Sequence, residues 1–200
     1  MRTKRILKGC LIAALCLGGV TILGSLAFVG YFGYQIEQST KPVTDLERYP
    51  DIVNTPNDPL TAHFPKAIPA NAKNVKLYYA PGFLQGGAIL QLRMQLPSDE
   101  ISKVTARFQP KAKRQYVPNG ENNSPTEETG PDGISISYDY KFHTGDVSEK
   151  ELPSNFPADY AIYVLDDTRG APEYDWNHPE FYGVAINETT SEIVYWMEDW

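Results

Sequence analysis

The feature that most constrains this chain is a long hydrophobic stretch near its N-terminus, from Ile6 to Phe32. No side chain between Gly9 and Phe32 is charged, and this run exceeds the roughly 20 apolar residues that a helix needs to cross a hydrocarbon core. We therefore predict a transmembrane helix over residues 6–33, with the lipid bilayer as the first partner of the chain.

The charges around this stretch predict its orientation. The first charged residue after it is the acidic Glu37, and Tyr31 and Tyr34 lie where an interfacial aromatic belt would form. Because basic flanks stay in the cytoplasm, we expect residues 1–5 to form a cytoplasmic tail and residues 34–200 to be extracytoplasmic. Four basic residues precede the uncharged run: Arg2, Lys4, Arg5 and Lys8.

A cleaved signal peptide is the alternative interpretation. Ser25 and Ala27 are small residues at the two positions that a signal peptidase recognises, so cleavage near Ala27 would release a secreted domain. However, the apolar run continues to Phe32 and exceeds the usual 7 to 15 residues of a signal-peptide core. We therefore favour a retained anchor. Its Cys10 and Cys16 are the only cysteines, so the exported part cannot form a disulfide.

The exported part is strongly acidic. Of the 18 Lys and Arg residues, 14 follow the hydrophobic stretch, together with all 25 Asp and Glu residues, so this part carries a formal charge of −11. Such a domain repels phosphate backbones, and we expect no nucleic-acid partner. Its length of roughly 165 residues suits a single domain with one core.

Prolines divide the exported part into a linker and a domain. Their spacing over residues 34–73 leaves no lasting apolar period, and proline favours extended backbone. We therefore predict a semi-rigid spacer over residues 34–73 and one folded domain over residues 74–200. The prolines are Pro42, Pro50, Pro56, Pro59, Pro65 and Pro69.

Alternation of apolar and polar residues predicts most of the domain as strands. Residues 134–142 alternate most cleanly and are expected in the middle of the sheet, whereas basic residues over 111–117 are typical of an edge strand. Residues 118–133 contain no large apolar side chain and are expected to form an exposed loop. The other predicted strands cover residues 74–79, 88–96, 160–165, 181–187 and 192–197, the last two as a hairpin.

One helix is predicted between two of these strands. Ser98 is a favourable N-cap, apolar residues then recur at helical spacing, and Pro110 ends the run. The expected fold class is therefore α+β, with an antiparallel sheet of about five or six strands and one packed helix.

The densest set of potential metal ligands lies in the connection after residue 165. Calcium favours several such oxygens, but the spacing matches no EF-hand loop. A charged, solvated connection is the preferred interpretation, and we expect no metal or cofactor. The candidate ligands are Asp166, Asp167, Asp175 and His178. Zinc is unsupported, because the three histidines have no ligand spacing and the exported part has no cysteine.

Aromatic residues gather in the same connection, where they could stack on sugar rings or anchor the loop to the sheet. Anchoring is the preferred interpretation. The candidate contact residues are Tyr174, Trp176, His178 and Tyr182.

The sequence contains no motif that assigns catalytic residues. There is no G-x-S-x-G nucleophile elbow, and the many carboxylates have no distinguishing context. We therefore expect a non-catalytic binding or accessory domain of the cell envelope, with an envelope protein or polysaccharide as its partner. The alternative is a small envelope hydrolase or a glycan-binding module.

Overall fold

A computed structural model describes residues 28–36, 40–54, 59–82, 87–120, 126–129, 135–145, 154–169 and 179–200. The chain divides into two compact units, Met1–Lys41 and Pro42–Trp200. The described part of the first unit is mainly a helix over residues 28–36. Residues 1–27, which include the predicted cytoplasmic tail and most of the predicted transmembrane helix, lie outside the described residues.

Within the described ranges, no helix is both long enough and apolar enough to cross a membrane.

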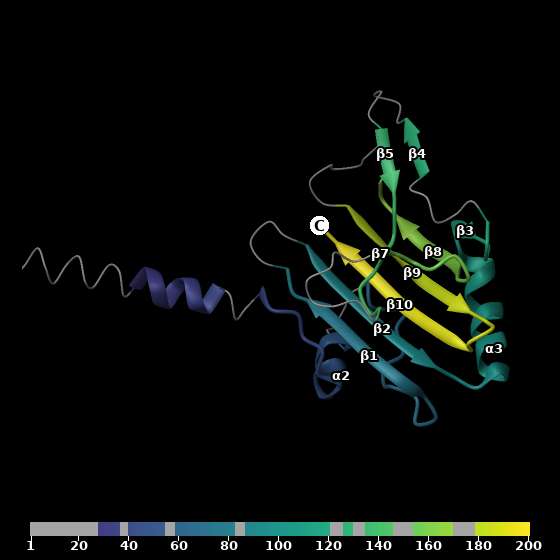
Figure 1. The fold of residues 1–200 in the computed structure, drawn as a ribbon, viewed down its shortest axis with the longest axis horizontal. Helices are drawn as coiled ribbons and strands as arrows, with labels where there is room; N and C mark the ends of the chain where they lie inside the picture. The colour runs from purple at the N-terminus through teal and green to yellow at the C-terminus, as the bar shows by residue number, and fades with distance from the viewer. Residues whose placement is uncertain are drawn as a thin grey trace, which may run out of the picture. The chain divides into compact units, whose positions relative to one another are not determined.

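The second unit is built on a sheet of six strands, and every neighbouring pair in it is antiparallel (Figure 1). This confirms the α+β class and the predicted strand number. The short strand β3 lies at one edge, as its basic residues predicted, and the C-terminal strand β10 lies in the interior between β2 and β9. In spatial order the strands are β1 (Lys73–Ala80), β2 (Ala88–Gln95), β10 (Glu192–Asp199), β9 (Glu180–Asn187), β8 (Ala161–Asp167) and β3 (Arg114–Tyr116).

The prediction of one mid-sheet strand over residues 134–142 is wrong. Strand β5 (Ser135–Tyr138) pairs with β4 (Thr126–Thr129), and β6 (Lys141–Phe142) pairs with β7 (Ser154–Asn155), each in a separate two-stranded sheet. The rings of Tyr140 and Phe142 are buried because they pack onto a face of the large sheet, although the segment does not pair within that sheet. Tyr140, for example, has its ring centroid 5.0 Å from that of Trp196. Strand β4 also lies inside the stretch that was expected to be a loop.

The predicted helix is present as α3 (Ser98–Phe108), followed by the 3-10 turn η2 (Gln109–Lys111). Its buried residues Ile101 and Phe108 face the sheet, and the Phe108 ring meets that of Tyr195 edge-on. The predicted N-cap is wrong: Pro97 occupies the cap position, and no side chain caps the helix. The rigid φ of proline suits it to the entry of a helix, so Ser98 is the first helical residue instead.

The compact unit begins well before residue 74. The 3-10 turn η1 (Leu46–Arg48) and the short helix α2 (Tyr49–Val53) lead into turns that carry buried apolar residues. Tyr49 and Val53 are fully buried, and the Tyr49 hydroxyl donates to the carbonyl of Pro65 at 2.5 Å. Residues 42–54 and 59–72, which were expected to belong to the linker, therefore pack with the sheet, because apolar residues stand between the prolines.

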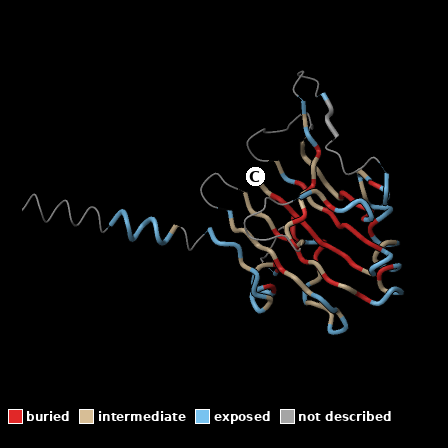
Figure 2. The backbone as a smooth tube through the Cα atoms, viewed as in Figure 1, coloured by how far each residue is buried: buried red, intermediate tan, exposed pale blue. Residues whose placement is uncertain are grey.

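The sheet has two covered faces, and burial is concentrated along its central strands (Figure 2). We call the face beneath α3 and residues 42–54 and 59–72 the α3 face, and the opposite face, beneath β6 and β7, the β6 face. The α3 face includes Leu90, Leu92, Met94, Val184, Ile186 and Ile193. The β6 face includes Tyr116, Val164, Phe181, Val194 and Trp196, covered by Tyr140, Phe142, Phe156 and Tyr160.

Candidate functional site

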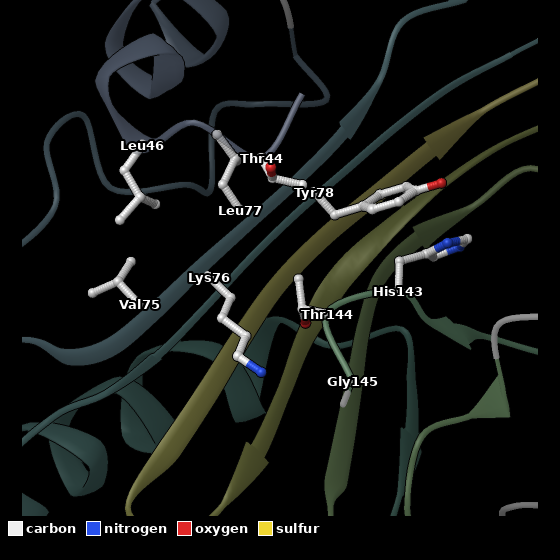
Figure 3. A pocket seen from close by; sticks show the side chains of 9 residues that line it. All are labelled: Thr44, Leu46, Val75, Lys76, Leu77, Tyr78, His143, Thr144 and Gly145. Carbon is white, nitrogen blue, oxygen red and sulfur yellow. The ribbon is translucent and has the colours of Figure 1, made fainter. Parts of the chain in front are cut away.

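A pocket of about 280 Å³ lies along the outer edge of strand β1. Residues 75–78 of β1 line its middle, Thr44 and Leu46 line one side, and residues 143–145 line the other. Figure 3 shows Leu46 and Val75 on one side, with the Tyr78 and His143 rings side by side on the other. The pocket therefore combines an apolar side with a polar side along a strand edge.

Two side chains of β2 hold the polar side in place. Gln91, which is fully buried, donates from Nε2 to the carbonyl of Lys141 at 2.6 Å, and its Oε1 accepts from the backbone N–H of His143 at 2.9 Å. Arg93, two residues further along β2, donates from Nη1 to the carbonyl of Thr144 at 3.0 Å. Residues 141–144 are thereby fixed over the β6 face by hydrogen bonds from the sheet below.

His143 is the most unusual group of this site. Its ring stacks on Tyr78, with centroids 4.8 Å apart, and its Nε2 lies 3.9 Å from Oε1 of Glu198, too far for a hydrogen bond. No described residue hydrogen bonds to this Nε2, although the side chain is only 7% exposed. Burial lowers the pKa of His143 to about 4, so the imidazole is neutral at neutral pH.

The pKa of Glu198 is shifted in the opposite direction, also because of burial. The residue is only 3% exposed, and burial raises the pKa of its carboxyl to about 7, although a hydrogen bond from Trp200 and the charge of Arg169 act in the other direction. The Nε1 of Trp200 donates to Oε2 of Glu198 at 3.2 Å. At neutral pH this site therefore holds a neutral imidazole beside a carboxyl that readily exchanges a proton.

A second buried charge on the β6 face is fully partnered. Oε2 of Glu192 lies 2.9 Å from Nε of Arg93, and Oε1 of Glu192 accepts from the Tyr160 hydroxyl. The Arg93 guanidinium also lies over the Phe142 ring, 5.3 Å from its centroid. Because both charges have close partners, this pair orders the β6 face and leaves no free group for chemistry.

Two of the four candidate metal ligands are described, and both are held by cations of the protein. Asp166 accepts from Nζ of Lys113 at 2.5 Å. Asp167 binds Arg169, with Oδ2 2.7 Å from Nη2, and accepts from the Tyr140 hydroxyl at 2.8 Å. Among the described residues, no group of three potential ligands is close enough to hold a metal ion. The other two candidates, Asp175 and His178, lie outside the described residues.

Of the predicted ligand contacts, only Tyr182 is described. It lies on β9, where its half-buried ring stacks on His63 at 5.2 Å on the α3 face. Nε2 of His63 donates to the carbonyls of Gly183 at 3.0 Å and Trp196 at 3.2 Å, which gives this histidine a packing role. Tyr174, Trp176 and His178 lie outside the described residues, so both the expected anchoring of the loop and the alternative contact with a ligand stay predictions for them.

Sequence reasoning missed the pocket on β1. Its polar side depends on contacts between residues about 50 positions apart, such as Gln91 with His143. In the sequence, Gln91 and Arg93 alternate with the apolar residues of β2 and therefore resemble residues of a solvated face. Only the fold shows that residues 141–144 cover them.

Comparison of the chain with protein-family models, with curated proteins and with solved structures found no match.

Proposed function

We propose that this chain is a single-pass membrane protein of the cell envelope whose folded unit, residues 42–200, binds a partner on the extracytoplasmic side. The uncharged run from Gly9 to Phe32 and the basic residues before it support the anchor and its orientation. The helix over residues 28–36 adds support, because an exposed cluster of large apolar side chains suits contact with lipid. The exposed residues are Phe28, Val29, Tyr31, Phe32 and Tyr34.

The pocket on β1 is the observation that carries a binding role. It offers an apolar side, a polar side and a strand edge within about 280 Å³, a size that suits a short segment or a small group rather than a large substrate. Glu198, the acid–base group nearest to His143, is almost completely enclosed. Binding without catalysis therefore fits this geometry better than hydrolysis does.

A small envelope hydrolase is the second candidate, and one observation favours it. His143 and Glu198 lie 3.9 Å apart beside the pocket, and a carboxyl with a pKa of about 7 is suited to general acid–base chemistry. If this candidate is correct, Glu198→Gln will abolish any hydrolysis that the purified chain performs on envelope polymers, and Glu188→Gln in the exposed hairpin turn will leave it unchanged.

Site-specific labelling tests the proposed location. In a Cys10→Ala, Cys16→Ala background the chain has no thiol, so Thr189→Cys in the exposed β9–β10 turn introduces a single reactive site. We expect a membrane-impermeant maleimide to label Thr189→Cys in intact spheroplasts. The matched variant Thr3→Cys should be labelled only after lysis. The reverse pattern would contradict the orientation, and loss of the Thr3→Cys site from the mature protein would indicate cleavage and secretion.

A further inference from the structure

The outer edge of β1 already pairs with an extended segment at one position. Val43 and Tyr79 form an isolated antiparallel bridge in which the Val43 N–H donates to the Tyr79 carbonyl at 2.7 Å and the Tyr79 N–H donates to the Val43 carbonyl at 2.9 Å. After Val43 the chain turns into η1 and leaves this edge. Beside β1 the described chain therefore forms one residue pair of the kind that a seventh strand would form, and the pairing does not continue beyond Val43.

At the next equivalent residue, Leu77, the edge has no backbone partner among the described residues, although only 3% of this residue is exposed. In an antiparallel strand, residues two apart direct their backbone N–H and C=O groups to the same side, so Leu77 directs both toward the side that Tyr79 uses for Val43. The register of β1 is regular from Lys76 to Ala80, which supports this assignment. Across the described ranges, no residue forms a hydrogen bond with the outward N–H or C=O of Leu77.

The pocket lies over this unpaired position of β1. Leu77 is one of its lining residues, Thr44 and Leu46 stand on one side, and Thr144 stands on the other. The Thr144 hydroxyl is buried and has no hydrogen-bond partner in the part of the chain that the structure describes. A strand edge between two rows of side chains is the geometry that binds extended peptides by strand addition.

The opposite edge of the sheet differs in length and protection. Strand β3 has only three residues, and Lys113 just before it forms an ion pair with Asp166. Short edges with basic residues are a common protection against unwanted pairing. Strand β1 has eight residues, and its outer edge is bridged at Tyr79 alone among the residues that are described.

We propose that the pocket on β1 binds an extended segment of a partner polypeptide, which adds to the sheet as a strand beside Leu77. Lys76, which also lines the pocket, favours a segment with an acidic side chain near this position. This inference rests on the binding function proposed above and specifies the chemical class of the partner.

The test uses the full chain in lipid nanodiscs and a phage-displayed library of linear peptides as the probe. We expect the selected peptides to contain acidic residues and, on binding, to slow hydrogen exchange of the Leu77 amide. Thr44→Trp fills the exposed side of the pocket and should weaken these peptides by about tenfold or more. The matched control Thr189→Trp places the same ring in the exposed β9–β10 turn and should leave affinity unchanged.

A charge reversal adds an independent readout. Lys76→Glu should weaken the binding of the same peptides. Lys111→Glu, at an exposed position of η2, changes the net charge equally and should leave their binding unchanged. Binding that leaves exchange at Leu77 unchanged would overturn strand addition while leaving a binding function intact. Protection of Leu77 that rises with protein concentration in the absence of peptide would identify a second copy of the chain as the occupant and would also overturn the proposal. Neither result depends on the maleimide labelling, which tests location alone.

Discussion

The two faces of the central sheet are stabilised by different chemistry. On the α3 face, aliphatic side chains such as Leu90 and Leu92 are fully buried beneath a helix. On the β6 face, rings such as Trp196 pack beside the buried carboxyl groups of Glu192 and Glu198. Apolar burial is non-directional, whereas a buried charge needs a specific partner. Substitutions on the α3 face should therefore change stability through side-chain volume, and substitutions on the β6 face should change it through charge and pH.

Removing one partner of the buried ion pair should have the largest effect on stability. Arg93→Met leaves the Glu192 carboxylate buried with only the Tyr160 hydroxyl beside it, and we expect a loss of about 3 kcal/mol in the free energy of unfolding. Urea unfolding of the full chain, followed by tryptophan fluorescence, measures this loss. The double variant Arg93→Met, Glu192→Gln should recover most of it, because no unpaired charge remains. A double variant as unstable as the single one would show that Arg93 acts through packing alone.

A cavity on the α3 face should cost slightly less and should not depend on pH. Leu92 is fully buried on β2, next to Arg93 in sequence but on the opposite face. We expect Leu92→Ala to lower the free energy of unfolding by about 2 to 3 kcal/mol, equally at pH 5 and pH 8. Leu92→Met, which keeps the volume, should cost less than about 1.5 kcal/mol. A strong pH dependence for Leu92→Ala would contradict the separation between the two faces.

Glu198 should make the β6 face less stable as the pH rises. Its carboxyl has a pKa of about 7 in the folded chain and 4.5 as its ordinary value, so above pH 4.5 the folded state holds a proton that the unfolded state has lost. Stability therefore falls between pH 4.5 and 7 and stays low above it. We expect Glu198→Gln to raise the free energy of unfolding by roughly 1 to 3 kcal/mol at pH 8, with little change at pH 4.5.

Glu188, in the exposed hairpin turn, provides the control for this shift. Glu188→Gln should have the same free energy of unfolding as the unmodified chain at both pH values, since this exposed residue buries no charge. If Glu198→Gln were equally destabilising at pH 4.5 and pH 8, the carboxyl of Glu198 would be ionised throughout and held by a partner.

The sequence predicted the large sheet well because its strands bury one or both faces in the main core. In strand β2 the apolar alternation matches the α3 face residue by residue, whereas β10 is a continuous apolar run that is buried on both faces. The same alternation over residues 134–142 led to a wrong assignment, because alternation reports which side chains are buried and not which backbone pairs with which. The linker interpretation placed the start of the domain too late for a related reason: proline spacing hid the apolar residues between the prolines.

The candidate site was less predictable, because it depends on contacts between distant segments. Asp166 and Asp167 were candidate ligands of a metal site that the sequence did not favour, and in the folded chain they lie at the end of β8 and pair with Lys113 and Arg169. His143 joins the pocket through Gln91, 52 positions away, and no local spacing announces such a pair. The role of a lone histidine or carboxylate therefore depends on its contacts in the folded chain and could not be predicted from local sequence.

The smallest expected effect concerns the entry to α3, where sequence and structure disagree. A true N-cap serine contributes about 1 kcal/mol through its side chain, and the sequence predicted that role for Ser98. In the structure Pro97 holds the cap position and no side chain caps the helix. We therefore expect Ser98→Ala to change the free energy of unfolding by less than about 0.5 kcal/mol, since alanine suits the first turn of a helix at least as well. Urea unfolding resolves the two cases, and a loss near 1 kcal/mol would restore Ser98 as the cap of the helix that covers the α3 face.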